Sequence, residues 1–413
     1  MPTAFLGYQN LAAIYEQTKR PKEALAVLAE AAAVPSPDVN FLIELGEAYR
    51  SHAAAFPADL ETIKPKLRAT LEALTKLAPR AQMLVIRQAE LWSFAGEFTR
   101  AAELYTKLLE RLPNNGLIRE RLFSLFSRAN DTNAAAAQLE ALVRDQPTDP
   151  RWHAIRGEMA AEKKDWDKAI ESYERAIQFG DRSPAVVEPS YFGLITVQLN
   201  RDKPDEVLKL LERAKGKLKL SFALEYFTAL AYTRIKDYAA SIKHFTSAEL
   251  LAKRDDPERL TALFYFQVGT AYERHKDIKT AESYFRQSLS IAPDFTEALN
   301  YLGYMWAERG ENLSEAKSMI ERALKQEPEN AAFLDSMAWV LFKLKEPKQA
   351  LEYQLKALKF QKEPDATLHD HLGDIFSTLQ QVDKAREQYE KALAIEPTDE
   401  IRKKLQALPA KKS

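Results

Sequence analysis

Residues 265–293 read YFQVGTAYERHKDIKTAESYFRQSLSIAP and contain one copy of a repeat of about 34 residues. A small residue, Gly269, lies in the first apolar segment, and Ala281 and Phe285 lie four residues apart in the second. A spacing of four places two side chains on the same face of a helix. Pro293 lacks a backbone N–H and therefore ends the second helix. The stretch predicts two helices joined by a short turn.

The same pattern recurs along the chain. Small residues lie four positions before large apolar residues, and a proline often follows at the end of the second predicted helix. An array of such units predicts a solenoid, in which each unit packs only against its neighbours. The pairs are Ala24 and Leu28, Ala101 and Tyr105, Ala135 and Leu139, Ala169 and Tyr173, and Ala385 and Tyr389, and the prolines are Pro79, Pro113, Pro147, Pro328 and Pro397.

These residues resemble the tetratricopeptide repeat, in about eleven copies. The resemblance implies an all-α, right-handed superhelical solenoid of antiparallel helix pairs with a C-terminal capping helix. Pentatricopeptide repeats have a similar period but bind RNA, and the near-neutral charge argues against them. The copies start near residues 5, 39, 82, 116, 150, 186, 222, 262, 296, 331 and 366.

The departures from the pattern predict how the chain is divided. Residues 1–183 form an amino-terminal block of about five copies, with an insertion near 51–64. Residues 184–399 form a carboxy-terminal block of about six copies, the first of them irregular because it contains two prolines near its start. Residues 400–413 are expected to form the capping helix and a disordered tail. We expect the array to bend where the two blocks meet.

Composition narrows the class of function. The chain has 59 Lys and Arg, 60 Asp and Glu and a net charge of -1, without the basic stripe of a nucleic-acid-binding protein. It has no cysteine, so disulfides, cysteine nucleophiles and thiolate metal sites are excluded. No apolar run approaches the roughly 20 residues of a membrane-spanning helix. Only 12 glycines are present, and no phosphate-binding glycine loop is found, so we expect no cofactor.

The first helix of each pair lines the concave groove in the tetratricopeptide family, so the resemblance implies a partner-binding surface. Aromatic rings provide apolar area at low entropic cost, and amides can bond to a peptide backbone, so this mixture suits an extended peptide. The alternative is that several of the rings pack between repeats. The expected groove residues are Tyr226, Phe227, Phe266, Gln267, Asn300, Tyr301, Tyr304, Asp335, Ser336, Trp339, Asp370, His371 and Asp374.

The acidic residues and histidines of this set do not predict a catalytic or metal site. His369 and His371 are two residues apart, a spacing that points two side chains in different directions on a helix. No third nitrogen ligand lies at a zinc spacing. We therefore expect no catalytic residue and no metal, and expect Asp335 and Asp370 to favour a basic or amine-bearing ligand.

The predicted function is that of a non-catalytic scaffold or adaptor that binds a peptide segment or a protein domain in its groove. The carboxy-terminal copies, including residues 299–316, resemble bacterial exported or lipoprotein-type tetratricopeptide proteins. That resemblance suggests a role in assembling an envelope or secretion complex and favours a periplasmic or outer-membrane location over a cytoplasmic one. The alternatives are a regulatory array of a larger enzyme or machine and an accessory protein of polysaccharide export. The sequence leaves the partner and the oligomeric state open.

Overall fold

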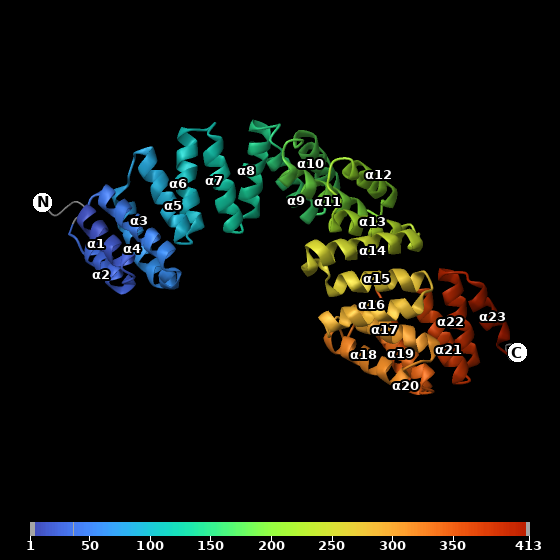
Figure 1. The fold of residues 1–413 in the computed structure, drawn as a ribbon. Helices are drawn as coiled ribbons and strands as arrows, with labels where there is room; N and C mark the ends of the chain where they lie inside the picture. The colour runs from blue at the N-terminus through green and yellow to red at the C-terminus, as the bar shows by residue number, and fades with distance from the viewer. Residues whose placement is uncertain (1–4, 36, 410–413) are drawn as a thin grey trace. The chain divides into compact units, whose positions relative to one another are not determined.

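The computed structural model describes residues 5–35 and 37–409. Helices follow one another throughout these residues, joined by short turns, and no β-strand occurs among them (Figure 1). The predicted all-α solenoid of antiparallel helix pairs is confirmed. The chain divides into two compact units, Met1–Val197 and Gln198–Ser413.

In the first unit, consecutive helices pack as pairs, and each pair packs against the next. The predicted insertion near 51–64 forms the end of one helix, a short 3-10 helix η1 (Pro57–Asp59) and the first turn of the following helix. The helices are α1 (Leu6–Gln17), α2 (Pro21–Ala32), α3 (Val39–Ala55), α4 (Leu60–Leu77), α5 (Gln82–Phe94), α6 (Phe98–Arg111), α7 (Gly116–Arg128), α8 (Thr132–Asp145), α9 (Pro150–Glu162), α10 (Trp166–Phe179) and α11 (Pro184–Asn200), whose last residues reach the second unit.

The second unit repeats the same arrangement and contains a second short 3-10 helix, η2 (Pro257–Arg259). Its core consists of clusters that join each helix pair to the next. The helices are α12 (Pro204–Lys215), α13 (Phe222–Arg234), α14 (Tyr238–Asp255), α15 (Ala262–Arg274), α16 (Ile278–Ile291), α17 (Thr296–Arg309), α18 (Leu313–Gln326), α19 (Ala331–Lys343), α20 (Pro347–Phe360), α21 (Ala366–Thr378), α22 (Val382–Ile395) and α23 (Asp399–Ala407).

Glycines mark the points where the two helices of a pair approach most closely. A Cβ atom on Gly269 of α15 would lie 2.7 Å from the Phe285 ring of α16. A Cβ atom on Gly303 of α17 would lie 2.9 Å from the Ile320 side chain of α18. In both pairs a glycine of the first helix lies against a large apolar side chain of the second, so this contact sets how closely the two helices approach.

The turns inside the pairs share one local geometry. Lys276 has φ +71°, and the Asp277 carboxylate after it accepts a hydrogen bond from the backbone N–H of Thr280. This side-chain acceptor satisfies one of the N–H groups left free at the start of α16. Lys236 and Asp237 form the same turn before α14.

The carboxy-terminal end of the array is closed by α23, which packs against α22. Ile401 is buried in the last apolar cluster, so α23 covers the apolar face that a final repeat would otherwise expose. The predicted capping helix is confirmed. The expected disordered tail falls largely on residues 410–413, which lie outside the described residues.

Candidate partner-binding site

A pocket of about 640 Å³ lies in the second unit, where α15, α17, α19 and α21 each contribute side chains. Five of the predicted groove residues line it, namely Asn300, Tyr301 and Tyr304 of α17 and Asp335 and Ser336 of α19. The segment between α20 and α21 supplies a further wall. Lining residues that the sequence did not predict are Arg274, Ala331, Ala332, Gln361, Lys362, Glu363, Asp365, Thr367 and Leu368.

Asn300 presents an unusual polar group in this pocket. Its side-chain oxygen is buried and has no hydrogen-bond partner among the described residues. The nearby Ser336 hydroxyl does not serve it, because that hydroxyl donates to the Ala332 carbonyl of its own helix at 2.9 Å. A buried acceptor without a donor costs about 1–3 kcal/mol. A ligand donor that reaches this oxygen would remove that cost.

The two tyrosines remain protonated at physiological pH. Burial raises the pKa of Tyr301 to about 12, and the Glu273 carboxylate, which accepts a hydrogen bond from its hydroxyl at 3.2 Å, acts in the same direction. Burial also raises the pKa of Tyr304, with a further contribution from Glu308. Both rings thus provide apolar surface and a neutral hydroxyl.

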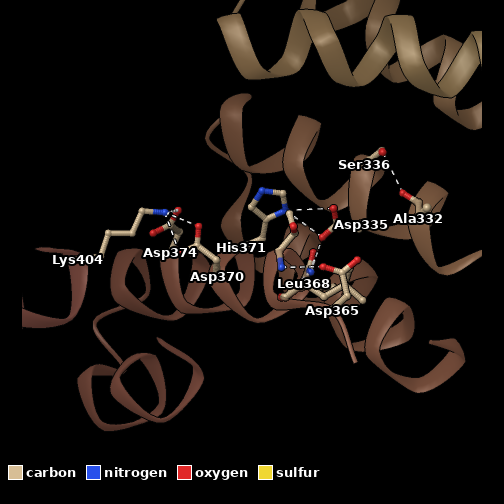
Figure 2. Close-up of polar contacts among 11 residues, drawn as sticks. Ala332, Asp335, Ser336, Asp365, Leu368, Asp370, His371, Asp374 and Lys404 are labelled. Carbon is tan, nitrogen blue, oxygen red and sulfur yellow. Dashed lines mark hydrogen bonds and ion pairs between the residues drawn. The ribbon is translucent and has the colours of Figure 1, made fainter. Parts of the chain in front are cut away.

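Asp335 and His371 form a buried ion pair that joins α19 to α21 (Figure 2). The His371 Nδ1 lies 2.9 and 3.1 Å from the two carboxylate oxygens, and the Gln354 amide donates to the same carboxylate at 2.6 Å. The Trp339 ring stacks on the imidazole, with centroids 4.0 Å apart and planes at 13°. Burial alone would lower the pKa of His371, but the Asp335 carboxylate outweighs it and raises that pKa above its ordinary value.

The location of this cluster differs from the expected groove position. Asp335, His371 and Trp339 are only 5%, 4% and 7% exposed. His371 and Trp339 contact each other and do not line the pocket. His371 and Trp339 therefore pack between neighbouring repeats, which is the alternative that the sequence left open for residues of the expected groove.

Asp370 and Asp374 lie beside the capping helix and share one cation (Figure 2). The Lys404 ammonium of α23 donates to both carboxylates at 2.7–2.9 Å, and the Tyr389 hydroxyl donates to Asp374 at 2.7 Å. Burial raises the pKa of Asp370, and the hydrogen bond from Lys404 opposes that shift. Since Asp335 and Asp370 both have internal cationic partners, the expected preference for a basic ligand loses its support.

The four remaining predicted residues lie on α13 and α15 and pack against neighbouring rings. The Tyr226 hydroxyl donates to the Gln267 side chain at 2.7 Å. Phe227 is half-buried beside Tyr226, with ring centroids 5.6 Å apart. Phe266 contacts Tyr301 edge to face at 5.7 Å. These residues extend the aromatic surface toward α13 but lie outside the lining of the pocket.

Sequence reasoning missed Gln354, Lys404 and Arg274. Gln354 lies on a second helix, and only the first helices were considered for the groove. Lys404 lies in the capping helix, which has no position in the repeat frame. The 36-residue separation of Asp335 and His371, close to one repeat, was the available signal for their pairing.

In the described residues, no cluster of three or more His, Asp or Glu side chains has an arrangement that could hold a metal ion.

Comparison with known families identifies the repeat. Residues 121–185 and residues 263–402 each match a family described as tetratricopeptide repeat. The chain is a tetratricopeptide repeat protein. Repeats of this kind indicate a protein-interaction scaffold, and the predicted family is confirmed.

Two relatives of this tetratricopeptide protein come from pseudomonads. It is 27% identical over 236 residues to a TPR repeat-containing protein of Pseudomonas aeruginosa. The aligned region covers 54% of this chain and 36% of the relative. It is 25% identical over 304 residues to the cellulose synthase operon protein C of Pseudomonas fluorescens. The aligned region covers 71% of this chain and 20% of the relative. The chain thus spans about a third and a fifth of the length of these two relatives.

Solved structures with some similarity include a tetratricopeptide repeat protein. A tetratricopeptide repeat protein from Parabacteroides merdae superposes with a TM-score of 0.49 at 18% identity, covering 62% of this chain and 97% of that one. The pilF protein of Pseudomonas aeruginosa gives a TM-score of 0.43 at 15% identity, covering 53% of this chain and 96% of that one.

Among the helices of the described chain, none combines the length and the apolar character needed to cross a membrane.

Proposed function

We propose that this protein is a non-catalytic scaffold that binds an extended peptide segment of a partner protein in the pocket of the second unit. The observation that carries the proposal is the unpaired, buried side-chain oxygen of Asn300. A backbone N–H of a bound peptide would satisfy that oxygen, and Tyr301 and Tyr304 would cover the apolar part of the peptide.

The charges around the pocket support recognition of the peptide backbone over recognition of one charge sign. Arg274 and Lys362 contribute positive charge to the lining, and Glu363 and Asp365 contribute negative charge. The Asp335 carboxylate also lines the pocket but is bonded to His371 and Gln354. A mixed rim of this kind selects neither an acidic nor a basic segment.

The test uses peptides selected from a random display library on the purified full chain, with counter-selection on Tyr304→Ala, so that the retained peptides depend on this pocket. Asn300→Ala should weaken binding of these peptides by about tenfold, the effect of a lost hydrogen bond of about 1.4 kcal/mol. Asn133→Ala makes the same chemical change at an exposed position of α8 and should leave binding unchanged. The midpoint of unfolding of Asn300→Ala should equal or exceed that of the parent, because the variant removes a buried acceptor that has no donor.

Equal peptide binding by the parent and by Asn300→Ala would reject the pocket as the peptide site. A loss of binding accompanied by a large loss of stability would instead make Asn300 a packing residue. The two readouts on one variant therefore separate a binding role from a structural role.

A second candidate function, in polysaccharide export, is supported by the similarity to cellulose synthase operon protein C. The half-buried Tyr301 and Tyr304 rings would stack on sugars in that case. Binding of soluble cello-oligosaccharides to the full chain, lost in Tyr304→Ala, would favour this function. Assembly of an envelope or secretion complex and a periplasmic or outer-membrane location belong to the scaffold proposal. A regulatory array of a larger enzyme or machine stays a separate alternative.

A further inference from the structure

The first unit contains a separate pocket of about 670 Å³ in which positive charge predominates. The first helices of three successive pairs contribute to it, with Arg50 on α3, Glu90 on α5, and Arg121 and Arg128 on α7. Lys64 enters from the start of α4. Four cationic side chains therefore surround a single carboxylate in a space of the size that usually holds a ligand.

The single carboxylate does not neutralise the two arginines beside it. The Glu90 oxygens lie 3.9 Å from Arg50 Nη1 and 4.0 Å from Arg121 Nη2, which is beyond hydrogen-bonding distance. A guanidinium group carries five N–H donors. Both arginines thus keep donors available for an anionic ligand.

The other two cations are held in place by their surroundings. The Arg128 guanidinium lies over the Phe98 ring at 4.2 Å and donates to the Ser93 hydroxyl at 3.3 Å. The Lys64 ammonium lies 2.5 Å from Glu61, whose side chain is 81% exposed. Because stacking and a neutral hydroxyl do not compensate charge, Arg128 remains an uncompensated cation that is already oriented.

Apolar side chains form most of the remaining lining, together with Ser93, Gly96 and Ser124. Leu125 and Tyr105 are buried, and Leu60, Phe94 and Phe98 are half-buried. Small inorganic anions would leave this apolar surface in contact with water. The lining therefore suits a ligand that carries carboxylates beside a large apolar side chain.

The excess of positive side chains is confined to this pocket and does not extend into the neighbouring one. A neighbouring pocket of about 580 Å³ shares Arg50 but is lined by the carboxylates of Glu16, Glu44 and Glu47. A long polyanion such as a nucleic acid needs a continuous basic surface. A short acidic segment that ends near Arg50 avoids the carboxylates of the neighbouring pocket.

We infer that the pocket formed by α3, α5 and α7 binds a short acidic segment of a partner protein, with an aromatic or aliphatic residue flanked by Asp or Glu. This site is distinct from the peptide pocket proposed for the second unit and differs from it in charge preference. The array then offers two docking sites of different chemistry on one chain.

The experiment selects heptapeptides from a random display library on the full chain, with counter-selection on the Arg121→Glu/Arg128→Glu variant. The peptides retained only by the parent should combine Asp or Glu with an aromatic or aliphatic residue. Such a peptide, labelled with fluorescein and blocked at both ends, is then titrated with single variants and followed by fluorescence anisotropy. Blocked ends exclude recognition of a terminal carboxylate.

Arg121→Glu should weaken binding by about tenfold or more, as expected for a charge pair reversed in a partly desolvated site. Arg144→Glu makes the same change at an exposed position of α8 outside the pocket and should stay within about twofold of the parent. Glu90→Gln should bind severalfold more tightly, because it removes the only carboxylate of the lining. A gain in affinity cannot result from misfolding. Asn300→Ala should bind this peptide like the parent, which separates the inference from the function proposed for the second unit.

Three results would overturn the inference. The first is that no peptide is enriched on the parent over the Arg121→Glu/Arg128→Glu variant, and the second is that the enriched peptides carry no acidic residues. The third is tighter binding of a fluorescein-labelled 20-nucleotide oligo-dT than of any selected peptide, which would assign the pocket to a nucleic acid.

Discussion

The buried ion pair between Asp335 and His371 should respond asymmetrically to loss of one partner or the other. His371→Leu leaves the Asp335 carboxylate buried, with the Gln354 amide as its remaining side-chain donor at 2.6 Å. Removing one partner of a buried pair costs about 3–5 kcal/mol, because the other charge stays uncompensated. Asp335→Asn instead leaves an imidazole that can lose its proton, so the cost should be nearer the value of a single hydrogen bond, about 1 kcal/mol.

The pH dependence of the same pair has a definite sign. The Asp335 carboxylate outweighs burial and raises the pKa of folded His371 above its ordinary value of about 6.5. The stabilisation is therefore fully present below about pH 6.5 and is lost as the pH rises through the raised folded-state pKa. In Asp335→Asn the main cause of the raised pKa is gone and burial dominates, so the contribution of His371 should instead increase with pH.

The assay is amide hydrogen exchange of α19 and α21 in the parent, in both variants and in the exposed control His275→Leu. Local exchange is preferable to a single melting curve, because repeat arrays need not unfold as one unit. Exchange in these two helices should accelerate far more in His371→Leu than in Asp335→Asn, with little change in the control. Equal acceleration in the two variants, or an unchanged pH dependence in Asp335→Asn, would refute the reasoning.

Two further substitutions test the contacts that hold the array together. Gly303→Ala places a Cβ atom 2.9 Å from the Ile320 side chain and 3.1 Å from the Ala316 carbonyl, so it should lower the unfolding free energy by about 1–3 kcal/mol. The control Gly7→Ala places a Cβ atom with nothing within 4 Å and should not lower it, and equal denaturation midpoints for the two variants would contradict this. Lys404→Met leaves Asp370 and Asp374 without their cation and should speed amide hydrogen exchange in α23. The control Lys403→Met lies on the exposed face and should not change it, so equal exchange in both variants would show that the ion pairs do not hold the capping helix.

The helix pairs and their closest contacts were predictable because they depend on local rules. In several copies a glycine on the first helix lies against a large side chain on the second, as Gly269 does against Phe285 and Gly303 against Ile320. The capping helix followed from the apolar face that the last repeat would expose. The division of the chain into blocks at residue 183 and the expected bend there stay predictions.

The orientation of individual groove residues was less predictable, because it depends on the neighbouring copies. Trp339 occupies a first-helix position that faces the groove in the family, yet its ring is buried against His371 of the next copy. The repeat frame places a residue on a helix face but does not specify what the adjacent repeat presents to that face.

Asn300 and Asp335 illustrate how one frame position acquires two roles. The two residues are 35 positions apart, and each lies in the first helix of its copy. The residue 36 positions after Asp335 is His371, a donor long enough to reach the carboxylate. The corresponding residue for Asn300 is Ser336, whose short hydroxyl is already bonded to Ala332 within its own helix. Asp335 therefore has a partner inside the protein, whereas the side-chain oxygen of Asn300 is left without one. A repeat position thus becomes a candidate contact for a ligand where the next copy fails to supply a partner, and this criterion can be applied to each position of the array.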